Sequence, residues 1–146
     1  MLIENNGLSL DGQVIILVED DVALRHLAAD IITELGGDCL AFESADDALI
    51  ALLESHGRCS LIIADHGLPG QIKGAEFLTL VNGKWPAIPT ILTSGYQLEV
   101  AHHRKPSEFL FKPWSLKELI DAMSLALTSA PGRLSPVQIG PQRDET

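Results

Sequence analysis

Several short apolar runs of this sequence end in a polar side chain that a buried segment does not need. In chain order these residues are Glu19 with Asp20, Asp65, Ser94 and Lys112. Three carboxylates brought together would repel one another and raise one another's pKa unless a cation lay among them. Each residue alone also has an ordinary explanation, because acids cap helices, serine forms turns and lysine is a common surface cation. Capping does not easily explain why all of these residues stand at the ends of apolar runs, and this recurrence favours a common site.

Asp65 follows the apolar segment 61–64 and precedes a turn formed by Leu68, Pro69 and Gly70. A short apolar run bounded by turn residues is typical of a fully buried strand. Asp65 would then lie at the carboxyl end of that strand, where open α/β sheets bind their ligands. This stretch alone fits an aspartate that only caps the turn equally well.

Strands and helices are predicted to alternate along the chain. The expected strands are residues 14–18, 39–42, 60–64, 90–93 and 108–111. The first expected helix runs from the N-cap Asp21 to a stop at Gly36-Gly37, and the second runs from Ser44 to near Gly57. Two more are expected over residues 74–81 and within 96–105. The last begins at the capping box of Ser115 and Glu118 and extends to Leu127. Leu27, Leu53 and Leu116 are assigned to the apolar faces of three of these helices.

This alternation predicts a doubly wound α/β fold, in which five parallel strands are joined by right-handed crossovers and helices cover both faces of the sheet. At 146 residues, 46% of them hydrophobic, the chain is long and apolar enough for one domain with a substantial core. We expect residues 1–12 to be a flexible arm, 13–128 to be the domain and 129–146 to be a disordered tail.

Composition excludes several classes of function. The net charge is −10, and the ten lysines and arginines are dispersed, so no basic patch is available for nucleic acid. No apolar run approaches the roughly 20 residues that a membrane helix requires. Cys39 and Cys59 do not form a Cys-x-x-Cys zinc motif and are expected to be buried thiols of a reducing compartment. The sequence therefore predicts a soluble cytoplasmic protein.

Order and spacing of these motifs resemble the receiver domain of two-component response regulators over about residues 13–127. The matching motifs are Glu19-Asp20, Asp65 with Leu68-Pro69, Ser94-Gly95, and Phe109-x-x-Lys112-Pro113. The resemblance implies the flavodoxin-like strand order 2-1-3-4-5, which puts the first and third strands side by side.

The resemblance also implies a Mg²⁺ site with Asp20 and Asp65 as direct ligands. The backbone carbonyl of Gly67 would be a third ligand, and Glu19 would act through a metal-bound water. Mg²⁺ is a hard ion that prefers oxygen ligands, which suits these acids, although the sequence does not distinguish it from Mn²⁺.

By the same resemblance, Asp65 is the nucleophile that accepts a phosphoryl group, and Lys112 and Ser94 contact the oxygens of that group. Ser94 would move toward the phosphoryl group, and Phe109 would turn into the space it leaves. The Lys112-Pro113 peptide bond is expected to be cis, which aims the lysine. Such a domain is not an enzyme toward other substrates, since it catalyses only its own phosphorylation and dephosphorylation.

The chain departs from the family pattern in two places. Between Asp65 and Gly74 it has one residue more than common receivers, and His66 could contact the phosphodonor or be a solvated loop residue. The segment between Ser94 and Lys112 is shorter by about one helical turn. It is therefore open whether this chain forms the family's fourth helix and whether it forms a homodimer through residues 95–128.

No output domain is expected after Leu127, so the chain should act alone as a single-domain response regulator. Its implied partner is a sensor histidine kinase or a histidine phosphotransfer protein. One alternative is a receiver-like adaptor that binds independently of phosphate, motivated by the atypical stretch 96–105. A phosphatase of the haloacid-dehalogenase type is a second alternative, but Gly67 stands where such enzymes place a second aspartate.

Overall fold

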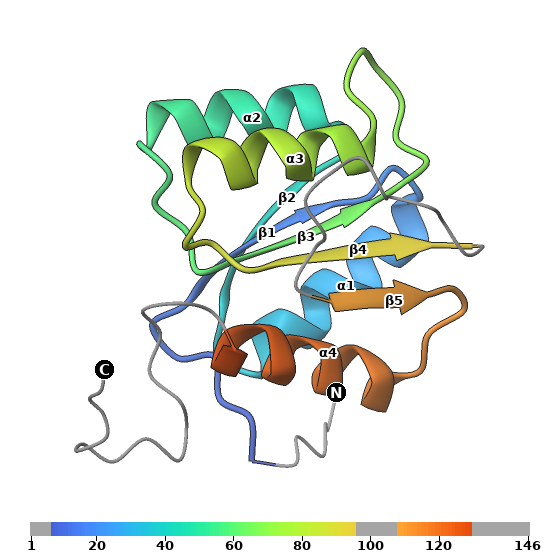
Figure 1. The fold of residues 1–146 in the computed structure, drawn as a ribbon. Coiled ribbons are helices and arrows are strands. Elements are labelled where there is room, and N and C mark those ends of the chain that lie inside the picture. The colour runs from blue at the N-terminus through green and yellow to red at the C-terminus, as the bar shows by residue number, and fades with distance from the viewer. Residues whose placement is uncertain (1–6, 96–107, 130–146) are drawn as a thin grey trace.

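The computed structural model describes residues 7–95 and 108–129 of the chain (Figure 1). The described strands are β1 (Val14–Val18), β2 (Asp38–Phe42), β3 (Leu61–Asp65), β4 (Thr90–Ser94) and β5 (Glu108–Phe111). The described helices are α1 (Val22–Glu34), α2 (Ala45–Glu54), α3 (Gly74–Lys84) and α4 (Leu116–Ser129). All five expected strands are confirmed, and each observed boundary lies within one residue of the expected one.

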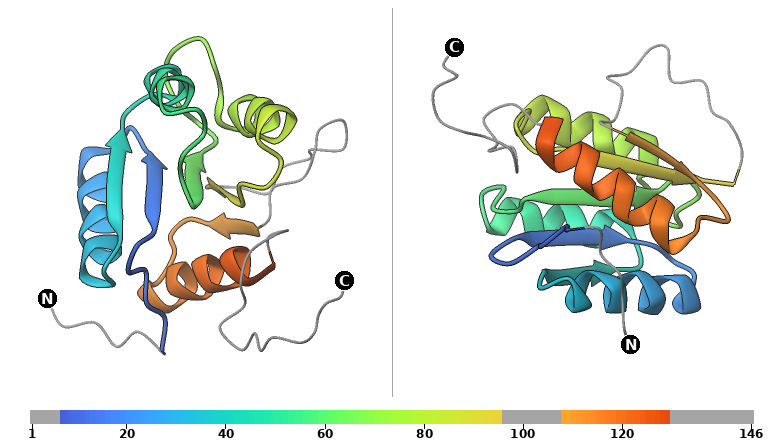
Figure 2. Two further views of the ribbon diagram at one scale, coloured as in Figure 1. Left: turned by 90° about the vertical axis from the view of Figure 1, so that its left-hand side faces the viewer. Right: turned by 90° about the horizontal axis from the view of Figure 1, so that it is seen from below.

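The sheet has the strand order β2-β1-β3-β4-β5, and every neighbouring pair is parallel. Helices α2 and α3 cover one face of the sheet, whereas α1 and α4 cover the other (Figures 1 and 2). Each face has its own apolar cluster, because alternate residues of a strand point to opposite sides. The doubly wound α/β prediction and its strand order are confirmed.

Short polar side chains begin three of the helices as the sequence predicts. The Asp21 carboxylate accepts a hydrogen bond from the Leu24 N–H at 3.0 Å, and the Ser44 hydroxyl accepts one from the Asp47 N–H at 3.2 Å. The capping box of α4 is also formed, since Ser115 and Glu118 each accept a hydrogen bond from the backbone N–H of the other. These caps satisfy amides that the first turn of a helix leaves without partners.

Parts of the predicted helix faces and ends are wrong. Leu27, Leu53 and Leu116 are exposed rather than buried, at 43%, 47% and 36% of their surface. Helical spacing selects a stripe of residues, but the width that the sheet covers depends on how the helix is tilted against it. Helix α3 also continues past the expected end at residue 81, as far as Lys84.

The start of the chain is more tightly attached than the expected flexible arm. Leu10 is fully buried in the cluster beneath α1 and α4, and its N–H donates to the Leu35 carbonyl oxygen at 2.8 Å. Leu8 packs against the same cluster. The expectation of a flexible arm over residues 1–12 therefore does not hold from Leu8 onward, because these leucines complete the core.

The remaining expectations concern the two cysteines, membrane-spanning helices and the segments that lie outside the described residues. Cys39 and Cys59 are half-buried, rather than buried as expected, and form no disulfide in the described part of the structure. Across residues 7–95 and 108–129, no helix is long and apolar enough to cross a membrane. The short helix expected at 96–105 lies outside the described residues, as do most of the tail 129–146 and the first half of the arm.

Candidate functional site

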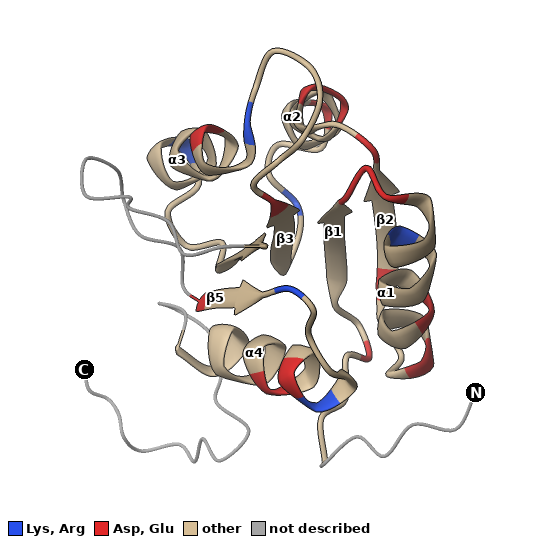
Figure 3. Cartoon of the chain, turned by 90° about the vertical axis from the view of Figure 1, so that its right-hand side faces the viewer, with Lys and Arg blue, Asp and Glu red and all other residues tan. Residues whose placement is uncertain are grey.

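The carboxyl ends of β1, β3, β4 and β5 meet at one edge of the sheet. Figure 3 shows an acidic segment after β1, an acidic tip on β3 and a basic segment after β5. Register explains the meeting, since Val18 pairs with Ala64 and Asp65 pairs with Thr93. The strands therefore end level with one another, and the polar residues in or just after their last positions are brought together.

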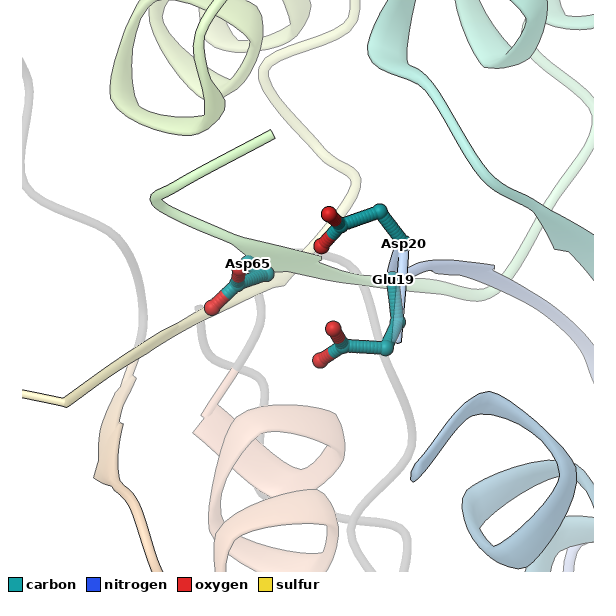
Figure 4. A group of neighbouring side chains, drawn as sticks. All are labelled: Glu19, Asp20 and Asp65. Atoms are coloured by element: carbon teal, nitrogen blue, oxygen red, sulfur yellow. The ribbon is translucent and has the colours of Figure 1, made fainter. Parts of the chain in front are cut away.

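Glu19, Asp20 and Asp65 form an acidic cluster at this edge. One carboxylate oxygen from each lies within 4.8 Å of the others. Glu19 and Asp20 extend from the end of β1 toward the side on which Asp65 lies (Figure 4). Glu19 and Asp65 are buried whereas Asp20 is exposed, so the cluster opens to solvent at Asp20. Three oxygen ligands with three negative charges fit a hard divalent cation such as Mg²⁺.

Lys112 joins the two buried acids of the cluster. Its Nζ lies 2.9 Å from Asp65 Oδ1 and 3.1 Å from Glu19 Oε1. Burial lowers the pKa of Lys112, but hydrogen bonds and charges from Asp65 and Glu19 outweigh it, so the pKa lies above its ordinary 10.5. Lys112 is therefore a fixed positive charge at neutral pH. The Lys112-Pro113 peptide bond is cis, as the sequence predicts.

Glu19 is held at the carboxyl end of β1 by several hydrogen bonds. Its Oε2 accepts from the Asp21 N–H at 3.0 Å, and its backbone carbonyl accepts from Arg25 at 2.8 Å. Burial raises the pKa of Glu19 above its ordinary 4.5, and the charge of Asp65 adds to this, whereas the Asp21 N–H and Lys112 act against it. The buried acid pair thus retains part of its mutual repulsion, which a bound cation would relieve.

Thr93 is a site residue that the sequence reasoning missed. It pairs with Asp65 across β3 and β4, is 4% exposed, and donates from Oγ1 to Asp65 Oδ1 at 3.2 Å. The signal that could have found it is a hydroxyl within the apolar run of β4, one residue before the expected Ser94. In a parallel sheet, residues paired in register point to the same face, so Thr93 had to face Asp65.

Ser94 lies at the end of β4, on the opposite face of the sheet from Thr93 and Asp65. Leu92, two residues before it, packs in the cluster beneath α2 and α3. Ser94 is buried, and its carbonyl oxygen accepts a hydrogen bond from the Lys112 N–H at 2.8 Å. Phe109 packs against the same cluster as Leu92 and is stacked on Phe111, with 6.2 Å between the ring centroids. Ser94 and Phe109 therefore share a face, which is what the expected coupling between them requires.

The loop after β3 is built by close backbone contacts. The His66 N–H donates to the Thr93 carbonyl oxygen at 2.8 Å, and the His66 carbonyl accepts from the Gly74 N–H at 3.2 Å. A Cβ at Gly74 would overlap the backbone of Asp65, so only glycine lets α3 begin this close to the end of β3. A Cβ at Gly67 would lie 3.7 Å from Asp65 Oδ2, which puts Gly67 beside the carboxylate.

Comparison with known proteins identifies the arrangement. The sequence profile of the response regulator receiver domain matches residues 15–124. The chain belongs to the response regulator receiver domain family. Receiver domains are signalling domains of two-component systems, so the resemblance inferred from the motifs is confirmed.

Relatives of this receiver domain include the response regulator protein FleR of Pseudomonas aeruginosa and the regulatory protein VirG of Agrobacterium tumefaciens. Identity to FleR is 32% over 123 residues, covering 81% of this chain and 25% of FleR. Identity to VirG is 31% over 122 residues, covering 80% of this chain and 44% of VirG. The chain thus spans about a quarter of FleR and less than half of VirG.

Among solved structures, the receiver domain of NtrX from Brucella abortus matches with a TM-score of 0.71 at 27% identity. The match covers 80% of this chain and 99% of the NtrX domain. A receiver domain protein from Clostridium thermocellum also has a TM-score of 0.71, at 19% identity, and supports the fold alone.

Proposed function

We propose that this receiver domain accepts a phosphoryl group on Asp65 from a sensor histidine kinase or a histidine phosphotransfer protein. The observation that carries the proposal is the position of Lys112, whose Nζ lies 2.9 Å from Asp65 Oδ1. Asp65 also belongs to the acidic cluster, in which one carboxylate oxygen of each acid lies within 4.8 Å of the others. A buried carboxylate flanked by a fixed cation and by further acids is the arrangement that phosphoryl transfer to an aspartate requires.

In the transfer, one Asp65 carboxylate oxygen forms a bond to phosphorus. The bond between phosphorus and the imidazole nitrogen of the donor histidine breaks, and the imidazole leaves with the electron pair. Lys112, whose charge is fixed at neutral pH, then interacts with an oxygen of the transferred group and stabilises its negative charge. The product is an acyl phosphate on Asp65, which water can later hydrolyse.

Asp20, Asp65 and the Gly67 carbonyl would hold Mg²⁺ at this site, with Glu19 acting through a water. The metal, when bound, supplies positive charge that offsets the three carboxylates and the incoming phosphoryl oxygens. The donor set fits this role, because every candidate ligand is oxygen and Asp20 leaves the cluster open to solvent. Both carboxylate oxygens of Glu19 already have donors, Oε1 from Lys112 at 3.1 Å and Oε2 from the Asp21 N–H at 3.0 Å, which suits an indirect rather than a direct ligand.

Phosphorylation would act as a two-state switch through Ser94 and Phe109. Ser94 moves toward the phosphoryl group, and Phe109 turns further inward on the face that both residues share. The hydrogen bond from the Lys112 N–H to the Ser94 carbonyl oxygen ties the two strands involved. A local event of this kind changes the surface only if the segment has two stable arrangements.

The proposal is tested by incubating the full chain with acetyl phosphate and Mg²⁺ and measuring intact mass. We expect an adduct of about 80 Da that is absent from Asp65→Asn and is released by hydroxylamine, as an acyl phosphate should be. Asp30→Asn, an exposed acid of α1, is the matched control and should be labelled like the wild type. EDTA should abolish labelling.

Labelling of Asp65→Asn at the wild-type rate, or no labelling of the wild type, would overturn the proposal. The second outcome would favour an adaptor that works without phosphate. Phosphotransfer from purified histidine kinases then identifies the partner among those that label the wild type.

A further inference from the structure

Thr93 contributes a second hydroxyl to the site, next to Ser94 in the sequence but on the other face of β4. Its Oγ1 donates to Asp65 Oδ1 at 3.2 Å, and Lys112 Nζ contacts the same oxygen at 2.9 Å. Two donors therefore converge on Oδ1. Within residues 7–95 and 108–129, the hydrogen bond and the ion pair of the Asp65 carboxylate to Thr93 and Lys112 are thus both made by Oδ1, and neither is made by Oδ2.

The surroundings of Thr93 hold it in this position. Register pairs it directly with Asp65, and the side chain is 4% exposed. Leu17, Ile63 and Leu110 line a small cavity beside it. Burying a hydroxyl among such groups is costly unless it is hydrogen-bonded, and a β-branched side chain in a strand has few rotamers. The hydrogen bond to Oδ1 satisfies that hydroxyl and at the same time fixes the plane of the carboxylate.

Oδ2 faces a different environment. A Cβ at Gly67 would lie 3.7 Å from it, so the missing side chain of Gly67 leaves room beside Oδ2. Oδ2 makes neither of these two contacts and retains lone pairs for a new bond, whereas Oδ1 already accepts from two donors.

We propose that Thr93 is a positioning residue, which together with Lys112 fixes the Asp65 carboxylate through Oδ1 and presents Oδ2 to phosphorus. The inference rests on the proposed phosphorylation of Asp65. With acetyl phosphate, a bond forms between Oδ2 and phosphorus, the bond from phosphorus to the acetyl oxygen breaks, and acetate leaves with the electron pair. Thr93 keeps its proton throughout.

The experiment compares the rates of labelling of wild type, Thr93→Val and Thr93→Ser with acetyl phosphate and with phosphoramidate. Valine keeps the shape of threonine and removes the hydroxyl, whereas serine keeps the hydroxyl and removes a methyl group. We expect Thr93→Val to be about tenfold slower with both donors, because a hydrogen bond to a charged group is lost. Thr93→Ser should restore a rate close to the wild type.

Thr90→Val is the matched control, because Thr90 is buried in the same strand at the end far from the site. It should be labelled at the wild-type rate. Circular dichroism and thermal unfolding establish that each variant is folded. If Thr93→Val does not fold, Thr93→Ala and Thr90→Ala form the equivalent pair.

The outcomes separate this inference from the proposed function. A wild-type rate in Thr93→Val, or an equal loss in Thr93→Ser or Thr90→Val, overturns the role of the Thr93 hydroxyl while Asp65 remains the phosphoacceptor. Slowing with one donor only would assign Thr93 to donor binding and would likewise overturn a positioning role. No labelling of the wild type would overturn both proposals.

Discussion

Gly74 offers a direct test of how closely the fold is built around Asp65. A Cβ added at Gly74 would lie 2.8 Å from the Asp65 carbonyl carbon and 2.8 Å from His66 Cα, and closer still to the Asp65 carbonyl oxygen. Carbon atoms pack at about 3.5 Å or more, so α3 and the end of β3 must separate by roughly 0.7 Å or more in Gly74→Ala. All of these atoms belong to backbone, which has little freedom to give way.

We expect Gly74→Ala to lose stability and activity together. Overpacking costs about 1–3 kcal/mol, and the better helix propensity of alanine returns less than about 1 kcal/mol. For a domain of this size the melting temperature should fall by about 3–10 °C. Because a displacement of about 1 Å can cost up to 100-fold in rate, labelling of Asp65 by acetyl phosphate should slow at least about tenfold.

Gly83→Ala is the matched control, because Gly83 lies in the same helix and a Cβ there would contact nothing within 4 Å. Removing a helical glycine should leave labelling unchanged and raise stability by about 0.5–1 kcal/mol. Melting and labelling of Gly74→Ala that match the wild type would refute the reasoning. An equal loss in Gly83→Ala would refute it as well.

Three further predictions concern charge and burial. Lys112→Met should slow labelling of Asp65 about 100-fold, since one donor to the developing charge is lost. Because the folded-state pKa of Glu19 is raised, the contribution of Glu19 to stability falls as the pH rises above 4.5. In Lys112→Met this contribution should fall further, so the melting temperature should drop more toward neutral pH than it does in the wild type. A drop no larger than in the wild type would contradict this. Burial raises the pKa of Cys39 from 9.0 to about 11, and the Asp38 charge adds to this shift. At pH 9 the folded chain therefore holds about 50-fold less Cys39 thiolate than the unfolded chain. Alkylation of Cys39 by iodoacetamide, measured in a Cys59→Ser background, should be slower by the same factor in the folded chain than in urea. Equal rates in the two states would contradict the prediction.

The fold was predictable because its signals are local. Five apolar runs predict the strands to within one residue, and three polar caps predict where three of the helices begin, although the end of α3 was missed. Parallel pairing then follows from alternation of strands and helices, and it brings the strand ends together. Glu19, Asp65 and Lys112 could thus be assigned to one site before their distances were known.

Features that depend on contacts distant in the sequence were not predictable. Leu10 was assigned to an arm, because nothing near it shows that the Leu35 carbonyl will receive its N–H. Leu27 and Leu53 have the spacing of buried residues, but the sheet does not reach them. Thr93 was overlooked because a threonine in an apolar strand is common, and only the register with Asp65 distinguishes it.

Alternation along the strands explains which polar residues meet at the site. Four of them lie two residues after a side chain of the cluster beneath α1 and α4, namely Glu19 after Leu17, Asp65 after Ile63, Thr93 after Ile91 and Lys112 after Leu110. Ser94 instead follows Leu92 on the face of α2 and α3, which Phe109 shares. The two faces meet where the Lys112 N–H donates to the Ser94 carbonyl oxygen. A change that moves Lys112 toward a new charge must therefore act on the end of β4. We expect it to reach Phe109 as well, because Lys112 directly follows β5, the strand that contains Phe109.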